Sequence, residues 1–414
     1  MRKIMTGVDV GSNSIKIVVG EINKDKFNIL AVSDTPCKGI KKGLVINSEE
    51  VITSLKEGFK KITDLMGLPV NKVILNVPTK DLEFKLETGS TTITNPDKLI
   101  GGSDIVRAIQ ASVYNKIVDT RELVTAIPVE YIINDEDKVN DPKNMIADRL
   151  SIKSVVITAF KKDTYPIISC LEKIGVQVVD VCLCPLGDYY QFRNEDTDDT
   201  TGIIINIGED ITTLSVFNKG VLTNVKELDI GSINVDNDLS FIYKTNKIDT
   251  RFLKEKLALA HKRLAQPNEY EEVTNKLGEK IKINQYEITE IVMSRLEETL
   301  NLIKKEINHL TKKEISYIIF SGGLTEIQDF QLLLDETFNK NTSIGRMNEL
   351  GVRNNKYSSA AGMIKYFNSK LELRDKEFTM FNKDELQDLV SSGRRVNISS
   401  NSFLGKIFGY FFDN

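Results

Sequence analysis

The sequence predicts an α/β protein built from two related lobes. Short apolar strands alternate with helical patterns through most of the 414 residues, as they do where helices cover a sheet. Two stretches, GVDVGSNSIKIVV at 7–19 and IINIGEDITTLSV at 204–216, share the order strand, polar residue, apolar residue, glycine, polar turn and strand. Because each stretch begins one half of the chain, the pattern indicates an internal duplication.

The first half begins with a predicted hairpin over residues 1–22, followed by further strands and a helix from Ser48 to Leu65 with apolar residues at helical spacing. Residues 84–162 have the pattern of a separate α+β subdomain, with a helix from Gly102 to about Ile117. A helix at 164–174 and the strand VQVVDVCLCP return to the first lobe, and the acidic segment 193–202 is expected to be a solvated connector. We assign the first lobe to 1–83 and 163–200.

The second lobe is assigned to 201–240 and 315–368, around a Lys- and Glu-rich, helix-rich subdomain at 241–314. Its later part contains the strand and turn SYIIFSGG and helical patterns through YSSAAGMIKYF. Residues 369–390 have few apolar anchors, and SSGRRVNISSNS is typical of a flexible segment. We therefore expect a flexible linker over 369–401 and a short helix over 402–414.

Composition places the chain among globular cytoplasmic proteins. Charged residues make up 28% and the net charge is −4, so nothing favours nucleic acid as a partner. No run approaches 18 apolar residues, and the N-terminus lacks the apolar core of a secretory signal. The four cysteines lie on apolar stretches without metal-ligand spacing, so we expect them to be core thiols in a reducing compartment.

The opening hairpin has the residues that a phosphate-binding loop needs. Gly11 lacks a Cβ, so the backbone amides at 11–13 can approach phosphate oxygens, and Ser12 or Ser14 can add a hydroxyl. Asp9, at the strand end, can hold a water of a bound Mg²⁺. An ordinary hairpin would show the same pattern, but a cleft between two halves needs one such loop from each half.

A third element lies at 318–330, where IIFSGGLTEIQDF runs from a buried strand through two glycines into a helix. The bare backbone of the two glycines would let a nucleoside pack flat near the start of that helix. Alone, this pattern mostly marks a tight turn between a strand and a helix. Three such elements in this order are much more specific.

In this order the motifs resemble those of the actin-like ATPase superfamily, and within it those of the bacterial cell-division family FtsA, over nearly the whole chain. ELVTAIPVEYIINDEDKVNDPKNMIADRLSIKSVVIT resembles the stretch that closes the inserted subdomain of FtsA, and LDIGSINVDNDLS its second connecting segment. The resemblance implies duplicated ribonuclease-H-like domains, an FtsA-type inserted subdomain and a C-terminal amphipathic helix. It also implies ATP and Mg as ligands, with Asp9 reaching the metal through water. The residues implied at the nucleotide are Gly11, Ser12, Asn13, Ser14, Gly208, Thr212, Gly231, Ser232, Lys254, Gly322 and Gly323.

The second loop departs from the family pattern Asp–x–Gly–Gly–Gly–Thr–Thr–Asp. Asn206 stands at the usual Asp position, and Glu209 and Asp210 replace two glycines. An amide accepts no proton near neutral pH, and losing a positioned general base typically costs roughly 10²–10⁴ in rate. The two acids would repel phosphates unless they point outward or a cation bridges them. Arg251 falls about where the family tends to carry an acid.

These departures favour a binding loop over a catalytic one. We assign no catalytic residue and expect ATP binding with slow or absent hydrolysis, because binding depends mainly on backbone amides. The alternative is a chain that has lost nucleotide binding altogether.

The C-terminal segment FLGKIFGYFF has the pattern of an amphipathic helix. The long polar tether before it favours a membrane-targeting helix over one docked on its own core. Few basic residues accompany it, so a single tail should bind lipid weakly, whereas many tails on one polymer would bind well. The apolar stripe consists of Phe403, Leu404, Ile407, Phe408, Phe411 and Phe412.

By resemblance, the chain is expected to polymerise and to tether filaments of FtsZ to the cytoplasmic face of the membrane at the division site. The C-terminal peptide of FtsZ would dock on the subdomain around 240–314, and membrane lipids, further copies of the chain and other division proteins would be partners. One rival is a small-molecule kinase of the same superfamily, which would need the acid that Asn206 replaces. Others are an Hsp70-like chaperone, whose substrate domain would not fit after Phe367, and a pilus-assembly or shape-determining actin homologue.

Overall fold

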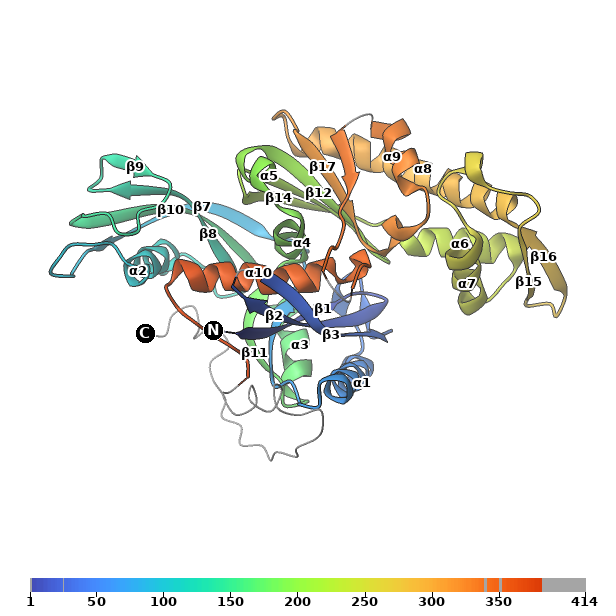
Figure 1. Cartoon of the computed structure of the whole chain (residues 1–414), viewed down its shortest axis with the longest axis horizontal. Coiled ribbons are helices and arrows are strands. Elements are labelled where there is room, and N and C mark those ends of the chain that lie inside the picture. Colours follow the sequence, from blue (N-terminus) through green and yellow to red (C-terminus); the bar gives the residue numbers. More distant parts are fainter. Residues whose placement is uncertain (1, 25, 339–340, 350–351, 382–414) are drawn as a thin grey trace.

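Two five-stranded sheets with the same topology form the centre of the molecule (Figure 1). The structure is a computed structural model that describes residues 2–24, 26–338, 341–349 and 352–381. In the first sheet β1 (Lys3–Val10), β2 (Ser14–Asn23) and β3 (Lys26–Pro36) form an antiparallel meander. β6 (Lys72–Asn76) and β11 (Gln177–Cys182) extend it in parallel beside β1.

The second sheet repeats this order. β12 (Thr201–Ile207), β13 (Thr212–Asn218) and β14 (Val221–Leu228) form the meander, and β17 (Tyr317–Ser321) and β18 (Thr342–Ile344) run parallel beside β12. The two orders, β11-β6-β1-β2-β3 and β18-β17-β12-β13-β14, correspond strand for strand. This correspondence confirms the predicted duplication.

Helices cover the first sheet on both faces. α1 (Ser48–Met66) and α3 (Lys161–Glu172) lie on one face and α10 (Ser358–Leu373) on the other, while β4 (Ile40–Lys41) and β5 (Leu44–Val45) form a small ribbon before α1. In α1 the residues that repeat at helical spacing, such as Val51, Leu55 and Ile62, are the buried ones. Asn47 caps this helix, and Gly67 ends it in the left-handed conformation at φ +74°.

Two helices, α4 (Cys184–Phe192) and α10, cross the middle of the molecule and pack on each other through glycines (Figure 1). A Cβ built on Gly187 would lie 2.4 Å from the carbonyl oxygen of Ser359, and one on Gly362 would lie 1.7 Å from the carbonyl oxygen of Gly187. Only glycine permits backbones to approach this closely. The contact therefore brings the residue after Gly187, which is Asp188, beside the start of α10.

The inserted subdomain forms its own sheet and core at one end of the molecule (Figure 1). β7 (Glu83–Thr92), β10 (Arg149–Phe160), β8 (Arg121–Ile133) and β9 (Asp137–Val139) lie in that order, and α2 (Gly102–Val113) packs on the sheet. The prediction that the helix reaches Ile117 is wrong, because Asn115 takes a left-handed conformation at φ +57° soon after Val113. Such a residue ends a helix.

The helix-rich subdomain lies at the opposite end from the insert (Figure 1). It contains α6 (Ser232–Tyr243), α7 (Lys247–Leu257), the short 3₁₀ turn Lys262–Leu264 and α8 (Gln285–Leu310). It also contains a hairpin that the sequence analysis missed, formed by β15 (Tyr270–Thr274) and β16 (Lys280–Asn284). The high Lys and Glu content hides this hairpin, although Gly278 marks its turn at φ +81°.

The predicted solvated connector contains a short helix, and the predicted flexible linker is partly ordered. The acidic connector 193–202 contains α5 (Glu195–Asp199), which Asn194 caps by accepting a hydrogen bond from the backbone N–H of Thr197. The predicted linker 369–401 begins too early, because α10 continues to Leu373 and residues 374–381 pack on the body. Met380 and Phe381 are buried there, and apolar side chains among charged ones provide the anchors that the sequence analysis undercounted.

Residues 374–381 also join the insert to the body. The carboxylate of Asp375 accepts hydrogen bonds from the first backbone amide of α2, at Gly102 (2.8 Å), and from Lys143 Nζ (2.6 Å). The backbone N–H of Met380 donates to the carbonyl of Ile4 at 2.9 Å. The predicted amphipathic helix, with its six apolar residues from Phe403 to Phe412, lies outside the described residues.

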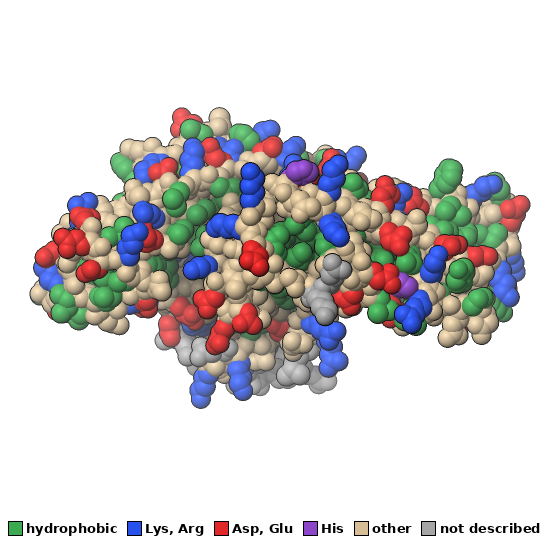
Figure 2. Space-filling model, turned by 90° about the horizontal axis from the view of Figure 1, so that it is seen from above, with side chains coloured by type: hydrophobic (Ala, Val, Ile, Leu, Met, Phe, Trp, Pro, Cys, Tyr) green, Lys and Arg blue, Asp and Glu red, His purple; other side chains and the backbone are tan. Residues whose placement is uncertain are grey.

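Within the described residues no helix is long and apolar enough to cross a bilayer. On the face shown in Figure 2, lysine and arginine side chains are interspersed with aspartate and glutamate. The remaining short elements are the 3₁₀ turns Gly323–Glu326 and Asn355–Tyr357 and the helix α9 (Phe330–Phe338).

Candidate functional site

A cleft of about 780 Å³ lies between the two lobes, and both contribute to its walls. The first hairpin loop, the second hairpin loop, the start of α6, α7, the turn after β17 and the start of α10 all line it. Ten of the predicted nucleotide and metal residues are among the lining residues: Asp9, Gly11, Ser12, Asn13, Ser14, Gly208, Ser232, Lys254, Gly322 and Gly323.

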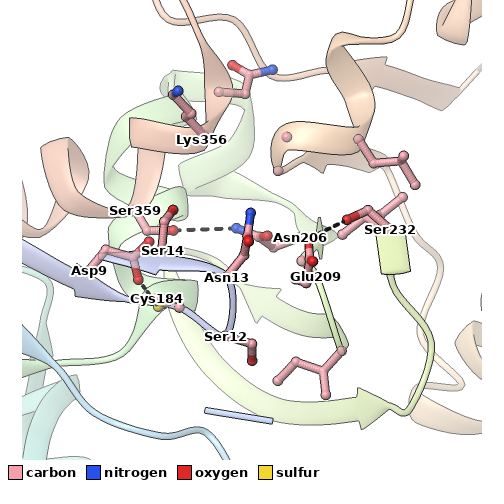
Figure 3. Close-up of a pocket in the computed structure, with 18 of the residues that line it drawn as sticks. Asp9, Ser12, Asn13, Ser14, Cys184, Asn206, Glu209, Ser232, Lys356 and Ser359 are labelled. Atoms are coloured by element: carbon pink, nitrogen blue, oxygen red, sulfur yellow. Dashed lines mark hydrogen bonds between the residues drawn. The ribbon is translucent and has the colours of Figure 1, made fainter. Parts of the chain in front are cut away.

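The two hairpin loops close in the same way. The backbone N–H of Gly11 donates to the carbonyl of Ser14 at 3.1 Å, and that of Gly208 donates to the carbonyl of Ile211 at 3.0 Å. A Cβ on Gly208 would lie 2.8 Å from that carbonyl oxygen, so the tight turn requires glycine. Figure 3 shows Asn13 of the first loop beside Asn206 and Glu209 of the second, with Ser12 and Ser14 farther from these two residues.

Asp9 lies at the base of the cleft in a fixed orientation. Its Oδ1 accepts a hydrogen bond from Asn76 Nδ2 at 2.8 Å, and Lys16 Nζ lies 3.8 Å from its Oδ2. The other end of the Asn76 amide accepts from the backbone N–H of Val10 at 2.7 Å. One oriented carboxylate beside a phosphate loop fits a hydrated Mg²⁺, which usually takes only one or two protein carboxylates.

The second loop carries its hydroxyl one residue later than predicted. Thr212 is fully buried, and its Oγ1 donates to the carbonyl of Ile230 at 2.7 Å, so it stabilises the start of α6 and does not line the cleft. Thr213 lines the cleft instead. Side chains alternate along a strand, so an error of one position exchanges a cleft residue for a core residue.

The two acids of the second loop are each held by partners within the chain. Glu209 forms an ion pair with Arg251 of α7 and accepts a hydrogen bond from Ser232 Oγ at 3.0 Å. Asp210 accepts from the backbone N–H of Lys42 in the first lobe at 3.1 Å. The guanidinium of Arg251 therefore offsets the charge of Glu209, which corresponds to the expected alternative in which a cation pairs with the acids.

Arg251 also crosses the cleft. Its Nη1 donates to Asn13 Oδ1 of the first loop at 2.8 Å, and its Nε lies 3.3 Å from Asp236 Oδ2 of α6. One side chain of α7 thus contacts both phosphate loops and α6. From the sequence, Arg251 is visible only as a departure from the family, because Glu209 and Asn13 lie 42 and 238 residues away.

The start of α6 approaches the second loop closely. A Cβ on Gly231 would lie 2.2 Å from the carbonyl oxygen of Glu209, so Gly231 serves backbone packing and does not itself line the cleft. Ser232 begins the helix and lines the cleft. Lys254 is buried on the cleft wall, where its Nζ lies 2.5 Å from Asp236 Oδ1.

The two glycines after β17 differ in what they require. Gly322 has φ +96°, and a Cβ there would lie 2.3 Å from the carbonyl oxygen of Ile207, whereas nothing lies within 4 Å of a Cβ on Gly323. The next element is a four-residue 3₁₀ turn, and the first α-helix, α9, begins only at Phe330. The expected helix directly after the glycines would begin at Leu324, and α9 begins six residues later.

Asn206 contacts a buried acid that sequence analysis did not single out. In β12 the side chains of Ile203, Ile205 and Ile207 pack into the second lobe, so Asn206 projects from the opposite face, toward α4 and α10. Its Nδ2 donates to Asp188 Oδ2 at 2.6 Å and to Ser359 Oγ at 3.4 Å, and Figure 3 shows it facing Ser359. Burial raises the pKa of Asp188 to about 6. The sequence signal that could have indicated Asp188 is its position as the one acid in the otherwise uncharged helix CPLGDYYQF.

One cysteine also belongs to the cleft. Cys37, Cys170 and Cys182 are buried, as predicted, but Cys184 is only partly buried and lines the cleft. Asn76 Nδ2 donates to its Sγ at 2.9 Å, and Asp9 Oδ1 lies 3.5 Å away. Burial, followed by the charge of Asp9, raises the pKa of the Cys184 thiol. Within the described residues no cluster of three metal-ligating side chains is found.

The duplicated sheets and the cleft between them define an actin-like protein. Solved structures agree with this fold: a type IV pilus biogenesis complex, PilM–PilN, matches with a TM-score of 0.57 at 12% identity over 90% of this chain and 99% of that one. MreB5 of Spiroplasma citri bound to ADP matches with a TM-score of 0.55 at 10% identity, over 90% of this chain and 99% of that one. These likenesses concern the fold alone.

Sequence comparison narrows the class. The model of the family "Cell division protein FtsA" matches residues 203–362, and that of the "SHS2 domain inserted in FTSA" matches 81–158. Cell division protein FtsA of Bacillus subtilis is 26% identical over 94% of this chain and 89% of its own length. That of Borreliella burgdorferi is 24% identical over 98% of each. The chain belongs to the FtsA family, which confirms the predicted family and the actin-like fold with its FtsA-type insert.

Proposed function

We propose that this chain binds Mg-ATP in the cleft between its lobes and, as a polymer, tethers FtsZ filaments of the division ring to the cytoplasmic membrane. The observation that carries the nucleotide part is the pair of glycine loops, closed by equivalent hydrogen bonds and facing each other across one cleft. Backbone amides and hydroxyls of these loops suit a phosphate chain. The bare backbone at Gly322 and Gly323 suits an adenosine.

The cleft binds ATP with slow or absent hydrolysis. Asn206 provides an amide where a base would be needed, and the carboxylate of Asp9 is already held by Asn76 and Lys16. Mg would be held through water at Asp9, and it would neutralise phosphate charge there. Within the chain, Arg251 offsets the charge of Glu209, which would otherwise repel the phosphates.

The C-terminal peptide of FtsZ docks on the helix-rich subdomain. Exposed apolar side chains on the neighbouring helices α6 and α7 supply a surface for it, including Phe241 at 85% and Ile248 at 81% exposure. Single exposed apolar residues are common, but large ones gathered on two packed helices are typical of a binding surface. The others on these helices are Ile242 and Phe252.

The membrane attachment belongs to residues 402–414, whose sequence gives one apolar stripe. A single short helix of this kind binds lipid weakly, so attachment depends on several chains acting together. Self-association of ATP-bound chains supplies that multiplicity. FtsZ filaments would then be recovered with membranes only when both the docking surface on α6 and α7 and the C-terminal helix act.

The nucleotide part is tested with the full chain by calorimetric titration of Mg-ATP. Ser12→Glu, which adds a negative charge to the first loop, is expected to weaken binding more than tenfold. Ser343→Glu, an exposed position on the edge strand β18, is the matched control and should bind normally. Equal binding by the two variants would contradict the assignment of the cleft.

The tethering part is tested by flotation of FtsZ filaments with phospholipid vesicles in the presence of Mg-ATP. The full chain should carry FtsZ into the floating fraction, and the chain ending at 401 should not. Phe241→Ser combined with Ile248→Ser should keep the chain on vesicles but lose FtsZ, whereas Leu277→Ser, exposed on the β15–β16 turn, should retain it. Flotation of FtsZ by the truncated chain would refute the membrane role of the tail.

A further inference from the structure

Asp188 of α4 lies at the wall of the cleft, and its side chain is fully buried, at 0% exposure. Its Oδ1 accepts hydrogen bonds from Ser358 Oγ at 2.6 Å and Ser359 Oγ at 2.8 Å, and its Oδ2 accepts from Asn206 Nδ2 at 2.6 Å. All three are neutral donors. The glycine contact between α4 and α10 holds this acid and the two serines in place.

This arrangement decides which end of the Asn206 amide faces the cleft. A carboxylate only accepts hydrogen bonds, so the amide nitrogen must point toward Asp188. The amide oxygen then lies on the other side, where a Cβ on Gly322 would come within 2.9 Å of it. Gly322 thus leaves space for the oxygen, and the second loop presents an acceptor without a charge.

We propose that Asp188 is a positioning residue of the nucleotide site: its buried carboxylate fixes the Asn206 amide so that an acceptor oxygen, and not an N–H donor, serves the bound Mg-ATP. The inference rests on the proposed function. It also assigns to α4 the carboxylate that position 206 of the second loop lacks. An acceptor suits a magnesium-bound water, and a donor in the same place repels it.

The same geometry explains why Asn206→Asp alone cannot supply a base. Asn206 Nδ2 lies 2.6 Å from Asp188 Oδ2, so a carboxyl group at position 206 would put two carboxyl oxygens in contact. Two such groups do not both ionise, so they would share one proton. A reciprocal exchange, Asp188→Asn with Asn206→Asp, keeps one acid and one amide in contact but moves the acid to the loop. In that variant the loop carboxylate would take a proton from the water that attacks the γ-phosphorus, as the bond to the ADP oxygen breaks.

The test uses the full chain and measures ATP affinity with Mg²⁺ and with EDTA, ATP turnover, and urea unfolding. Asp188→Asn is expected to weaken ATP binding about tenfold with Mg²⁺ and less than twofold with EDTA, because the freed amide can turn its nitrogen to the cleft. Asn206→Asp should not raise turnover more than twofold. The exchanged variant should be more stable in urea than either single variant. Its ATP turnover should exceed that of the wild type by at least tenfold.

Asp104→Asn is the matched control, a buried carboxylate in the inserted subdomain that accepts a hydrogen bond from the backbone N–H of Gly101 at 2.9 Å. It should leave ATP binding unchanged. Equal loss of affinity in Mg²⁺ and EDTA would overturn the proposal, since it would mean that Asp188 only supports the fold. An exchanged variant less stable than both single variants, or Asn206→Asp turnover equal to that of the exchange, would overturn it too. A wild type that binds no ATP would instead refute the proposed function.

Discussion

Removing Arg251 should weaken the binding of ATP by exposing the charge of Glu209. In Arg251→Met the Glu209 carboxylate, whose side chain is 14% exposed, keeps only the hydroxyl of Ser232 as a partner. At roughly 5 Å, a unit charge and a phosphate oxygen repel by about 3 kcal/mol at an effective dielectric of 20 and by about 1 kcal/mol in water. The site lies between these limits, so we expect about 2 kcal/mol, or roughly a 30-fold increase in Kd.

Calorimetric titration with ATP and with adenosine measures this effect. Adenosine carries no phosphate, so its affinity should change less than threefold. Glu209→Gln removes the repelling charge, and the double variant Arg251→Met with Glu209→Gln should recover most of the affinity for ATP. Equal losses for ATP and adenosine, or no recovery in the double variant, would refute the electrostatic account and indicate that Arg251 supports the cleft only through its hydrogen bond to Asn13.

Three further outcomes follow from the described contacts. The pKa of Asp188 is raised to about 6 from 3.8, so the native state holds this proton more tightly than the unfolded state does, and stability falls as pH rises through 6. Between pH 5 and pH 7 the free energy of unfolding in urea should fall by about 1 kcal/mol more for the wild type than for Asp188→Asn. Gly322→Ala should lower the free energy of unfolding by at least about 2 kcal/mol, because its Cβ would strike the backbone of the second loop at a positive φ, whereas Gly323→Ala should cost less than about 1 kcal/mol. Asp375→Ala should speed amide hydrogen exchange at the start of α2, and the exposed control Glu136→Ala should not.

The duplicated hairpins could be predicted because their pattern is local: a glycine after a buried strand, a polar turn and a second strand. The contacts that tune the cleft could not, because they join residues far apart in sequence. Asp188 meets Asn206 only after two glycines let α4 and α10 touch. Arg251 was visible as a departure from the family, but its pairing with Glu209 depends on where α7 packs.

The wrong predictions for Thr212, for the β15–β16 hairpin and for residues 374–381 have other causes. Thr212 and Thr213 are adjacent, and only the register of β13 decides which of them reaches the cleft. The β15–β16 hairpin was missed because its two strands are only five residues long each and lie within a Lys- and Glu-rich region. Residues 374–381 were assigned to a linker because they contain only three apolar anchors, Phe378, Met380 and Phe381, among charged residues. The sequence does not show the surface that these anchors contact.

We expect the glycine contact between α4 and α10 to serve also as a mechanical pivot, because α10 packs on β1 and β2 of the first sheet and α4 on β12 and β14 of the second. The helices touch backbone to backbone at Gly187 and Gly362, so these two residues bring no side chain that would be compressed when one lobe turns against the other. The inserted subdomain and the helix-rich subdomain extend from the centre to opposite ends of the long axis (Figure 1). They form two lever arms, and a small angular change at the pivot moves each tip in proportion to its distance. Replacing either glycine with alanine would lock the pivot or force it apart, because the added carbon would have no space.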